Sequence, residues 1–190
     1  MTRIPTPAPK TGATASPRFF STRTLLTLAA IGVAGAIVVT PSAWLARGLW
    51  VAAPMLYGLA VVPYVIPGVI AQSLVRRGGA ALLVGVVAGV VAIPFTGGIG
   101  TLTLLLFVAV FQELTYLITR WRRWTTALAY LAAAVLTVAY AAYWAVTLNA
   151  EVFPGWVKAG AIALLAVTIF ASTTLGLVIS SGLRRAGVGR

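Results

Sequence analysis

The sequence predicts an all-α integral membrane protein, a bundle of six transmembrane helices with both termini in the cytoplasm. Three observations lead to this fold class. Of the 190 residues 61% are hydrophobic and 8% charged, and the mean hydropathy is +1.02, whereas soluble domains carry roughly a quarter charged residues. Six apolar stretches approach the roughly 20 residues that a spanning helix needs. The basic residues gather in short clusters between those stretches.

The apolar stretches are separated by short polar segments. They cover about residues 23–41, 50–75, 79–95, 101–119, 125–148 and 159–183. The first stretch, followed by Pro41-Ser42-Ala43, has some features of a secretory signal peptide. Its apolar run is longer than the usual core of roughly 7–15 residues. We therefore expect it to remain in the protein as the first helix.

The positions of the basic residues predict the orientation. If the N-terminus is cytoplasmic, every Lys and Arg except Arg47 and Lys158 falls on the cytoplasmic side. An excess of Lys and Arg on cytoplasmic loops is the main orientation signal in membrane proteins. The sequence thus predicts a multi-pass protein of the cell membrane. Its transmembrane domain is residues 23–185, and residues 186–190 form a short cytoplasmic tail.

Residues 1–22 differ in composition from the rest of the chain. They contain four prolines among Thr, Ala, Lys and Arg, which is typical of disordered segments. We expect a disordered basic cytoplasmic tail. A solvated tail that enforces the orientation is favoured over one that binds lipid headgroups.

The composition excludes several classes of function. The chain has no His, Cys or Asp, and its only acids are Glu113 and Glu151. A His-based catalytic triad and a Cys or His zinc site are therefore impossible. No nucleotide-binding motif occurs, and the basic residues do not form one stripe that would follow a nucleic acid. We expect a protein that is not an enzyme, has no cofactor or metal site, and meets the lipid bilayer and not nucleic acid.

Glu113 is the one acid inside an apolar stretch. Acids within the membrane are costly and are therefore functional candidates. Glu113 lies about 18 Å from the outer end of its helix, and Gln112 and Tyr116 could complete a polar patch that binds a cationic or hydrogen-bond-donating substrate. The alternative is a structural role in which Glu113 pairs with an inner-loop arginine. Both interpretations remain open from the sequence.

Aromatic residues form a second candidate site near the outer surface. Tyr140 and Trp144 lie four residues apart and share one helix face, and Tyr57 and Tyr64 lie seven residues apart on another helix. Together such faces could stack a flat ligand in a pocket that is apolar with a few polar groups. The plainer alternative is that they are membrane-interface or packing residues.

Two segments carry a resemblance to a known family. The first is Tyr57-Gly58 with the stretch from Ile70 to Leu82, and the second runs from Glu113 to Trp121. They resemble the junction of helices two and three, and the fourth helix, in the hydroxymethylpyrimidine/thiamine substrate-binding (S) components of energy-coupling factor (ECF) transporters. The resemblance covers about residues 50–125, and the remainder agrees by hydropathy.

This resemblance implies an S component that binds a vitamin or vitamin precursor from outside. It would work with a membrane coupling (T) component and two ATP-binding cassette ATPase subunits. It implies that Glu113 contacts the substrate, and that Ala30 and Ala34, a small-xxx-small pair, face the coupling protein. Packing inside the bundle is an equal alternative for that pair. Where such proteins carry acids on the third helix, this chain has Gly85 and Ala92, which implies a less acidic site.

The sequence therefore predicts one substrate-binding set and one alternative function. The predicted set is Glu113, Gln112, Tyr116, Tyr57, Tyr140 and Trp144. The alternative is a non-transporting membrane scaffold or assembly subunit, in which Glu113 would only hold helices together.

Overall fold

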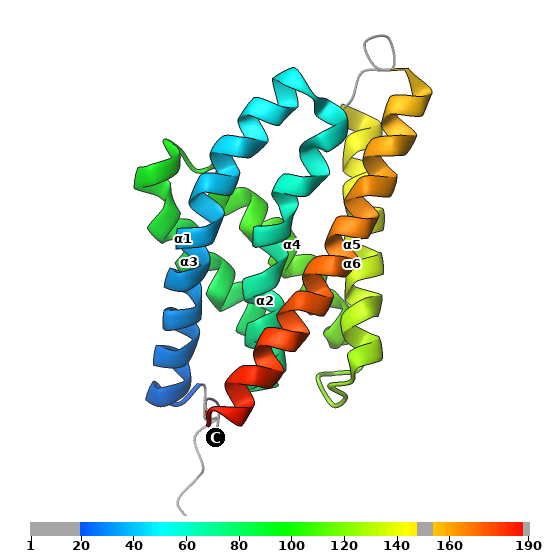
Figure 1. Ribbon diagram of the computed structural model, residues 1–190. Coiled ribbons are helices and arrows are strands. Elements are labelled where there is room, and N and C mark those ends of the chain that lie inside the picture. Colours follow the sequence, from blue (N-terminus) through cyan, green and yellow to red (C-terminus); the bar gives the residue numbers. More distant parts are fainter. Residues whose placement is uncertain (1–19, 148–153, 188–190) are drawn as a thin grey trace, which may run out of the picture.

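The protein is a bundle of helices (Figure 1). The computed structural model describes residues 20–147 and 154–187, and within these ranges all regular structure is helical. The elements are α1 (Thr22–Ala52), the 3₁₀ helix η1 (Pro54–Val61), α2 (Val62–Val75), α3 (Ala80–Thr96), α4 (Gly100–Ile118), α5 (Thr126–Thr147) and α6 (Gly155–Arg185). The predicted tail 1–22 lies almost entirely outside the described residues, as does most of the predicted tail 186–190.

The elements agree with the predicted all-α fold. Five stretches are long and apolar enough to cross a membrane, η1 and α2 together forming one of them. The exception is α3, which is apolar but has 17 residues. At 1.5 Å per residue α3 is about 25 Å long, somewhat short of a typical hydrocarbon core.

The second span is the centre of the bundle. α2 packs against α1, α3, α4 and α6, α1 lies along α3, and α5 lies between α4 and α6. Every helix contributes to the largest buried cluster, for example Val39 of α1, Leu136 of α5 and Leu165 of α6, each with 0% exposure. This cluster therefore joins all the described helices, and two smaller buried clusters lie beside it.

Glycines let α1 approach its neighbours closely. A Cβ atom at Gly32 would lie 2.7 Å from Val87 of α3, and one at Gly35 would lie 2.8 Å from Pro67 of α2. Close backbone approach of this kind is how helices associate in lipid, where no hydrophobic force drives them together. Ala30 and Ala34 are exposed. The bundle thus packs on the glycines and does not use the predicted alanine pair.

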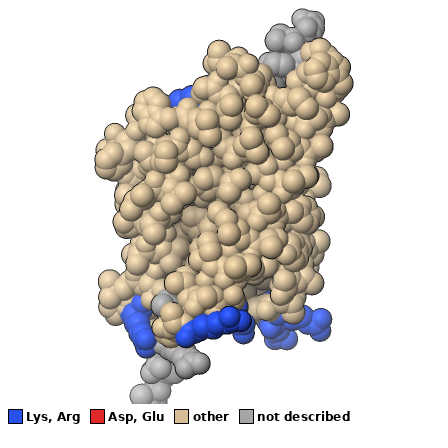
Figure 2. Space-filling model, in the orientation of Figure 1, with Lys and Arg blue, Asp and Glu red and all other residues tan. Residues whose placement is uncertain are grey.

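Most of the arginines lie at one end of the bundle. This arginine end contains the start of α1, the α2–α3 turn, the α4–α5 loop and the end of α6. Figure 2 shows Lys and Arg along this end, while the visible face between the two ends carries none. Its basic residues are Arg23, Arg76, Arg77, Arg120, Arg122, Arg123, Arg184 and Arg185. The opposite end is called the far end below.

One predicted boundary is wrong. The first apolar stretch was expected to end at residue 41, but α1 continues through Pro41 to Ala52. Its last turns pack against η1, and the Ser42 hydroxyl donates to the Ala60 carbonyl at 2.7 Å. Tertiary packing therefore keeps the segment helical despite the proline, and Arg47 lies on a helix where an outer loop was expected.

Candidate ligand-binding cavity

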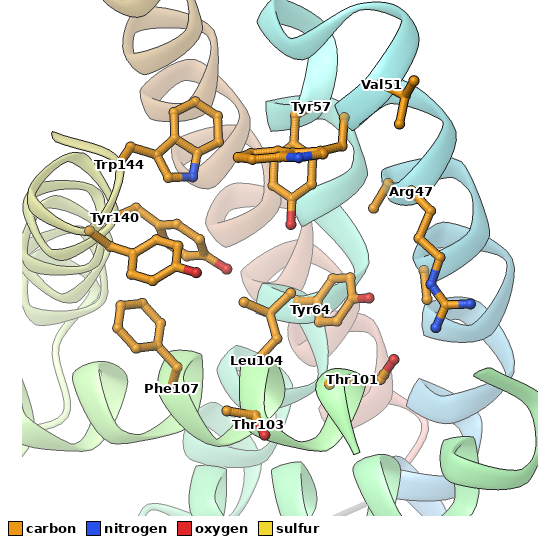
Figure 3. Close-up of a pocket in the computed structure, with 15 residues that line it drawn as sticks. Arg47, Val51, Tyr57, Tyr64, Thr101, Thr103, Leu104, Phe107, Tyr140 and Trp144 are labelled. Atoms are coloured by element: carbon orange, nitrogen blue, oxygen red, sulfur yellow. The ribbon is translucent and has the colours of Figure 1, made fainter. Parts of the chain in front are cut away.

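A cavity of about 710 Å³ opens among α1, η1, α2, α4 and α5 at the far end (Figure 3). Its volume falls within the roughly 300–1,000 Å³ typical of small-molecule sites. Seven of the fifteen lining residues are aromatic. The aromatic lining residues are Trp50, Tyr57, Tyr64, Phe107, Tyr140, Tyr143 and Trp144.

One side of the cavity is a wall of rings, here called the aromatic wall and consisting of Tyr57, Phe107, Tyr140 and Trp144. Tyr140 and Trp144 come from one face of α5 and are 1% and 2% exposed. The ring centroids of Tyr57 and Trp144 lie 5.5 Å apart, and those of Phe107 and Tyr140 lie 5.1 Å apart. These separations are those of favourable aromatic pairs, so the rings hold one another in place along this side of the cavity.

Arg47 of α1 supplies the charge on the other side. Among the described residues that line the cavity, it is the one charged side chain. Its guanidinium donates from Nη2 to the Thr96 carbonyl at the end of α3 and lies 4.8 Å from the centroid of the Trp44 ring. The carbonyl and the ring fix the position of the cation. A guanidinium has five N–H donors, so the bond to Thr96 does not exhaust it.

The first turn of α4 also lines the cavity. Gly100, Thr101 and Thr103 all face it. The N-cap residue of α4 is Ile99, which makes no side-chain capping bond, and no acid lies in the first turn. The first amides of a helix have no partner within the helix and carry a partial positive charge. The cavity therefore meets an uncapped helix N-terminus on the same side as Arg47.

The hydroxyl of Tyr140 is the buried polar group without a partner in this cavity. It makes no hydrogen bond to any described residue, although buried hydroxyls are nearly always bonded. In Figure 3 it points into the cavity. The hydroxyl is thus placed to bond a ligand.

Glu113 lies elsewhere, near the arginine end. It is 6% exposed and does not line the cavity. Its Oε1 accepts from the Ala81 amide at 2.9 Å, and its Oε2 accepts from the Trp121 indole at 3.2 Å. A carboxylate at a helix N-terminus stabilises that helix. Glu113 thus caps α3 and holds Trp121 of the α4–α5 loop in place. The structural role considered from the sequence had an inner-loop arginine as the partner of Glu113 instead.

The two residues predicted beside Glu113 are also packed inside the bundle. The Gln112 Nε2 donates to the Val65 carbonyl at 3.1 Å, and the Tyr116 ring stacks on Trp124 with centroids 4.7 Å apart. Neither lines the cavity. The predicted set therefore separates into Tyr57, Tyr140 and Trp144, which meet in one cavity, and three residues of α4 that do not join them.

The sequence did not single out Arg47, Trp50, Phe107 or the first turn of α4. Arg47 was expected in an outer loop and Trp50 at the start of the second apolar stretch, so the sequence did not place them on one helix face. Their spacing of three residues is the signal that a longer first helix would have revealed. Phe107 lies in an apolar stretch where an aromatic residue carries no distinguishing pattern.

Comparisons with known proteins identify the family. A profile described as ABC-type cobalt transport system, permease component, matches residues 23–139, which is more than half of the chain. The chain belongs to this family. The match runs from α1 into α5, so it contains the α1, η1 and α4 sides of the cavity. The described residues of this chain include no cluster of His, Cys, Asp and Glu that could hold a metal ion.

A solved structure has the same fold. It is described as the crystal structure of an S-component of ECF transporter, with a TM-score of 0.78 and 19% sequence identity. The alignment covers 90% of this chain and 88% of that chain. At this identity the similarity establishes the fold. No curated protein matches the sequence significantly.

Proposed function

We propose that this chain is the substrate-binding membrane subunit, or S component, of an ECF importer for a vitamin or vitamin precursor. The observation that supports this most is the aromatic cavity at the far end, in a fold shared with an S component. A bundle that served only as a scaffold would have no need of a cavity of this size with an unpartnered hydroxyl in it.

The orientation follows from the charges. With the arginine end in the cytoplasm, as the positive-inside rule favours, the start of α1 and the end of α6 are cytoplasmic and the cavity opens to the outside. The protein is then a multi-pass component of the cell membrane that collects its ligand from the exterior. This is the arrangement that an importer needs.

The chain itself performs no chemistry in this proposal. It has no nucleotide-binding motif, so ATP hydrolysis belongs to two ATPase subunits that act through a membrane coupling protein. Ala30 and Ala34 are exposed on α1 and form the small-residue face for that coupling protein. Ligand binds in the cavity, and movement of the complex then releases it inside.

The cargo is proposed to be organic. The family description mentions cobalt, but cobalt sites in proteins use imidazole, thiolate or carboxylate ligands. The sequence has no His, Cys or Asp. A cavity lined by rings suits a flat heteroaromatic molecule of the hydroxymethylpyrimidine or thiamine type. In this proposal the ligand contacts Tyr57, Tyr140 and Trp144, while Glu113 acts on stability alone.

The test is uptake by cells that produce the full chain together with its coupling protein and ATPases. We expect ATP-dependent accumulation of labelled hydroxymethylpyrimidine or thiamine. At substrate concentrations below saturation, Trp144→Ala should reduce uptake by about five- to tenfold, because it removes a ring on which the ligand stacks. The matched control is Trp156→Ala at the same end, since Trp156 is 70% exposed and does not line the cavity.

Two results would contradict the proposal. A correctly inserted chain that does not co-purify with the coupling protein and ATPases is not their substrate-binding subunit. An assembled complex whose uptake is equally reduced by the Trp144 and Trp156 variants does not use this cavity.

A further inference from the structure

The cavity has two chemically different sides. The aromatic wall stands on one side, whereas Arg47 and the first turn of α4 lie on the other (Figure 3). Tyr64 lies between the two sides, and its hydroxyl is directed toward Arg47 and Thr101 (Figure 3). A ligand in contact with both sides needs a flat ring at one end and a group that accepts hydrogen bonds at the other.

The polar side favours negative charge. Arg47 is cationic at every physiological pH, and the uncapped N-terminus of α4 adds unpaired amides and a partial positive charge. No acidic side chain is present among the described lining residues; Glu113 is bonded near the arginine end, and Glu151 lies outside the described residues. A cationic ligand would therefore meet repulsion and find no described counter-charge.

The hydroxyl of Tyr140 is an independent indication of a ligand. It is buried, directed into the cavity and without a partner among the described residues. A hydroxyl both donates and accepts, so a ligand with a polar group beside the ring satisfies it. Arg47 and the α4 amides are donors without acceptors, so the other side of the cavity presents donors to an anion.

From these observations we propose that the cavity selects an aromatic ligand that carries an anionic group, a carboxylate or a phosphate, with the anion held by Arg47 and the first turn of α4. This deepens the proposed function and rests on it. It specifies the charge of the cargo and predicts that neutral and cationic ring compounds bind more weakly than the anion.

The test is a binding titration of the purified full-length chain in detergent. The probes share one ring and differ in charge. They are 4-amino-5-hydroxymethyl-2-methylpyrimidine, which is neutral, its phosphate ester and the corresponding 5-carboxylate, which are anions, and thiamine, which is a cation. At least one anion should bind about tenfold or more tightly than the neutral probe, as expected for a charge-assisted hydrogen bond. The anion that binds more tightly shows whether the site is built for phosphate or for carboxylate.

Variants of Arg47 distinguish an effect of its charge on binding from an effect on folding. Arg47→Gln should reduce the preference for the anion over the neutral probe to about twofold. Arg47→Lys keeps the charge and should keep most of the preference. Arg122→Gln removes an equal charge at the arginine end and should change neither.

The outcomes distinguish this proposal from the proposed function. If the neutral or cationic probe binds most tightly, and Trp144→Ala weakens that binding, the substrate-binding function stands and the anion proposal is wrong. If the anion preference survives in Arg47→Gln, the proposed role of Arg47 is wrong. If folded protein binds no probe at millimolar concentration, both proposals are contradicted.

Discussion

Replacement of Tyr140 by Phe tests whether its hydroxyl is reserved for a ligand. The substitution removes one oxygen and leaves the ring, which packs against Phe107 at 5.1 Å. A buried polar group without a partner costs roughly 1–3 kcal/mol, and the Tyr140 hydroxyl is such a group. The ligand-free protein should therefore be as stable as the wild type, or more stable by about 1 kcal/mol.

Ligand binding should respond in the opposite direction. A hydrogen bond to an uncharged acceptor on the ring contributes about 0.5–1.5 kcal/mol, which corresponds to a loss of affinity of about two- to tenfold. The assay pairs thermal unfolding of the purified chain with a calorimetric titration of the pyrimidine phosphate described above. Substitutions that disturb packing reduce both quantities. Only a hydroxyl reserved for ligand gives lower affinity with unchanged or higher stability.

Tyr130→Phe provides the control. The Tyr130 hydroxyl is hydrogen-bonded to the Thr174 hydroxyl at 3.0 Å and does not line the cavity. Its removal should lower stability slightly, by about 0.5–1.5 kcal/mol, and should leave affinity unchanged. The reasoning is refuted if Tyr140→Phe destabilises the ligand-free protein and binds the ligand as the wild type does.

Three further substitutions test the helix cap at Glu113 and the packing at two glycines by their effect on stability. Glu113→Ala should lower the free energy of unfolding by about 1–3 kcal/mol, because the Ala81 amide and the α4–α5 loop lose their acceptor; unchanged thermal stability would contradict the capping role. Gly58→Ala should destabilise by about 1–3 kcal/mol, since its Cβ would lie 3.0 Å from the Leu165 backbone nitrogen. Gly48→Ala should stabilise by about 0.5–1 kcal/mol, since nothing lies within 4 Å; equal melting temperatures for the two glycine variants would show that the η1–α6 contact is less tight than described.

The helical architecture could be predicted from the sequence because it depends on hydropathy alone. Apolar runs of about 20 residues and the arginines between them indicate where helices turn, and the predicted loops around Arg76 and Arg120 agree with the structure. The end of α1 could not be found in this way. Pro41 and the polar residues after it indicate a loop, and only packing against η1 keeps that segment helical.

The site could be predicted in part for a related reason. Tyr140 and Trp144 are neighbours within one helix, so sequence spacing alone places them together. Their meeting with Tyr57 depends on how η1 packs, which spacing suggests but does not determine. The role of Glu113 could not be predicted in this way. Counting along the helix gave the depth of Glu113, but its side chain is bonded to the Ala81 amide, 32 positions away in the sequence.

The central claim is that ligand binds at the aromatic wall and not at the intramembrane acid. The most direct measurement is the affinity of the purified chain for its best-binding pyrimidine probe, compared between Trp144→Ala and Glu113→Gln at a temperature where both variants are folded. We predict that Trp144→Ala weakens binding by about five- to tenfold, whereas Glu113→Gln binds within about twofold of the wild type. Loss of binding in Glu113→Gln, with affinity retained in Trp144→Ala, would contradict the account.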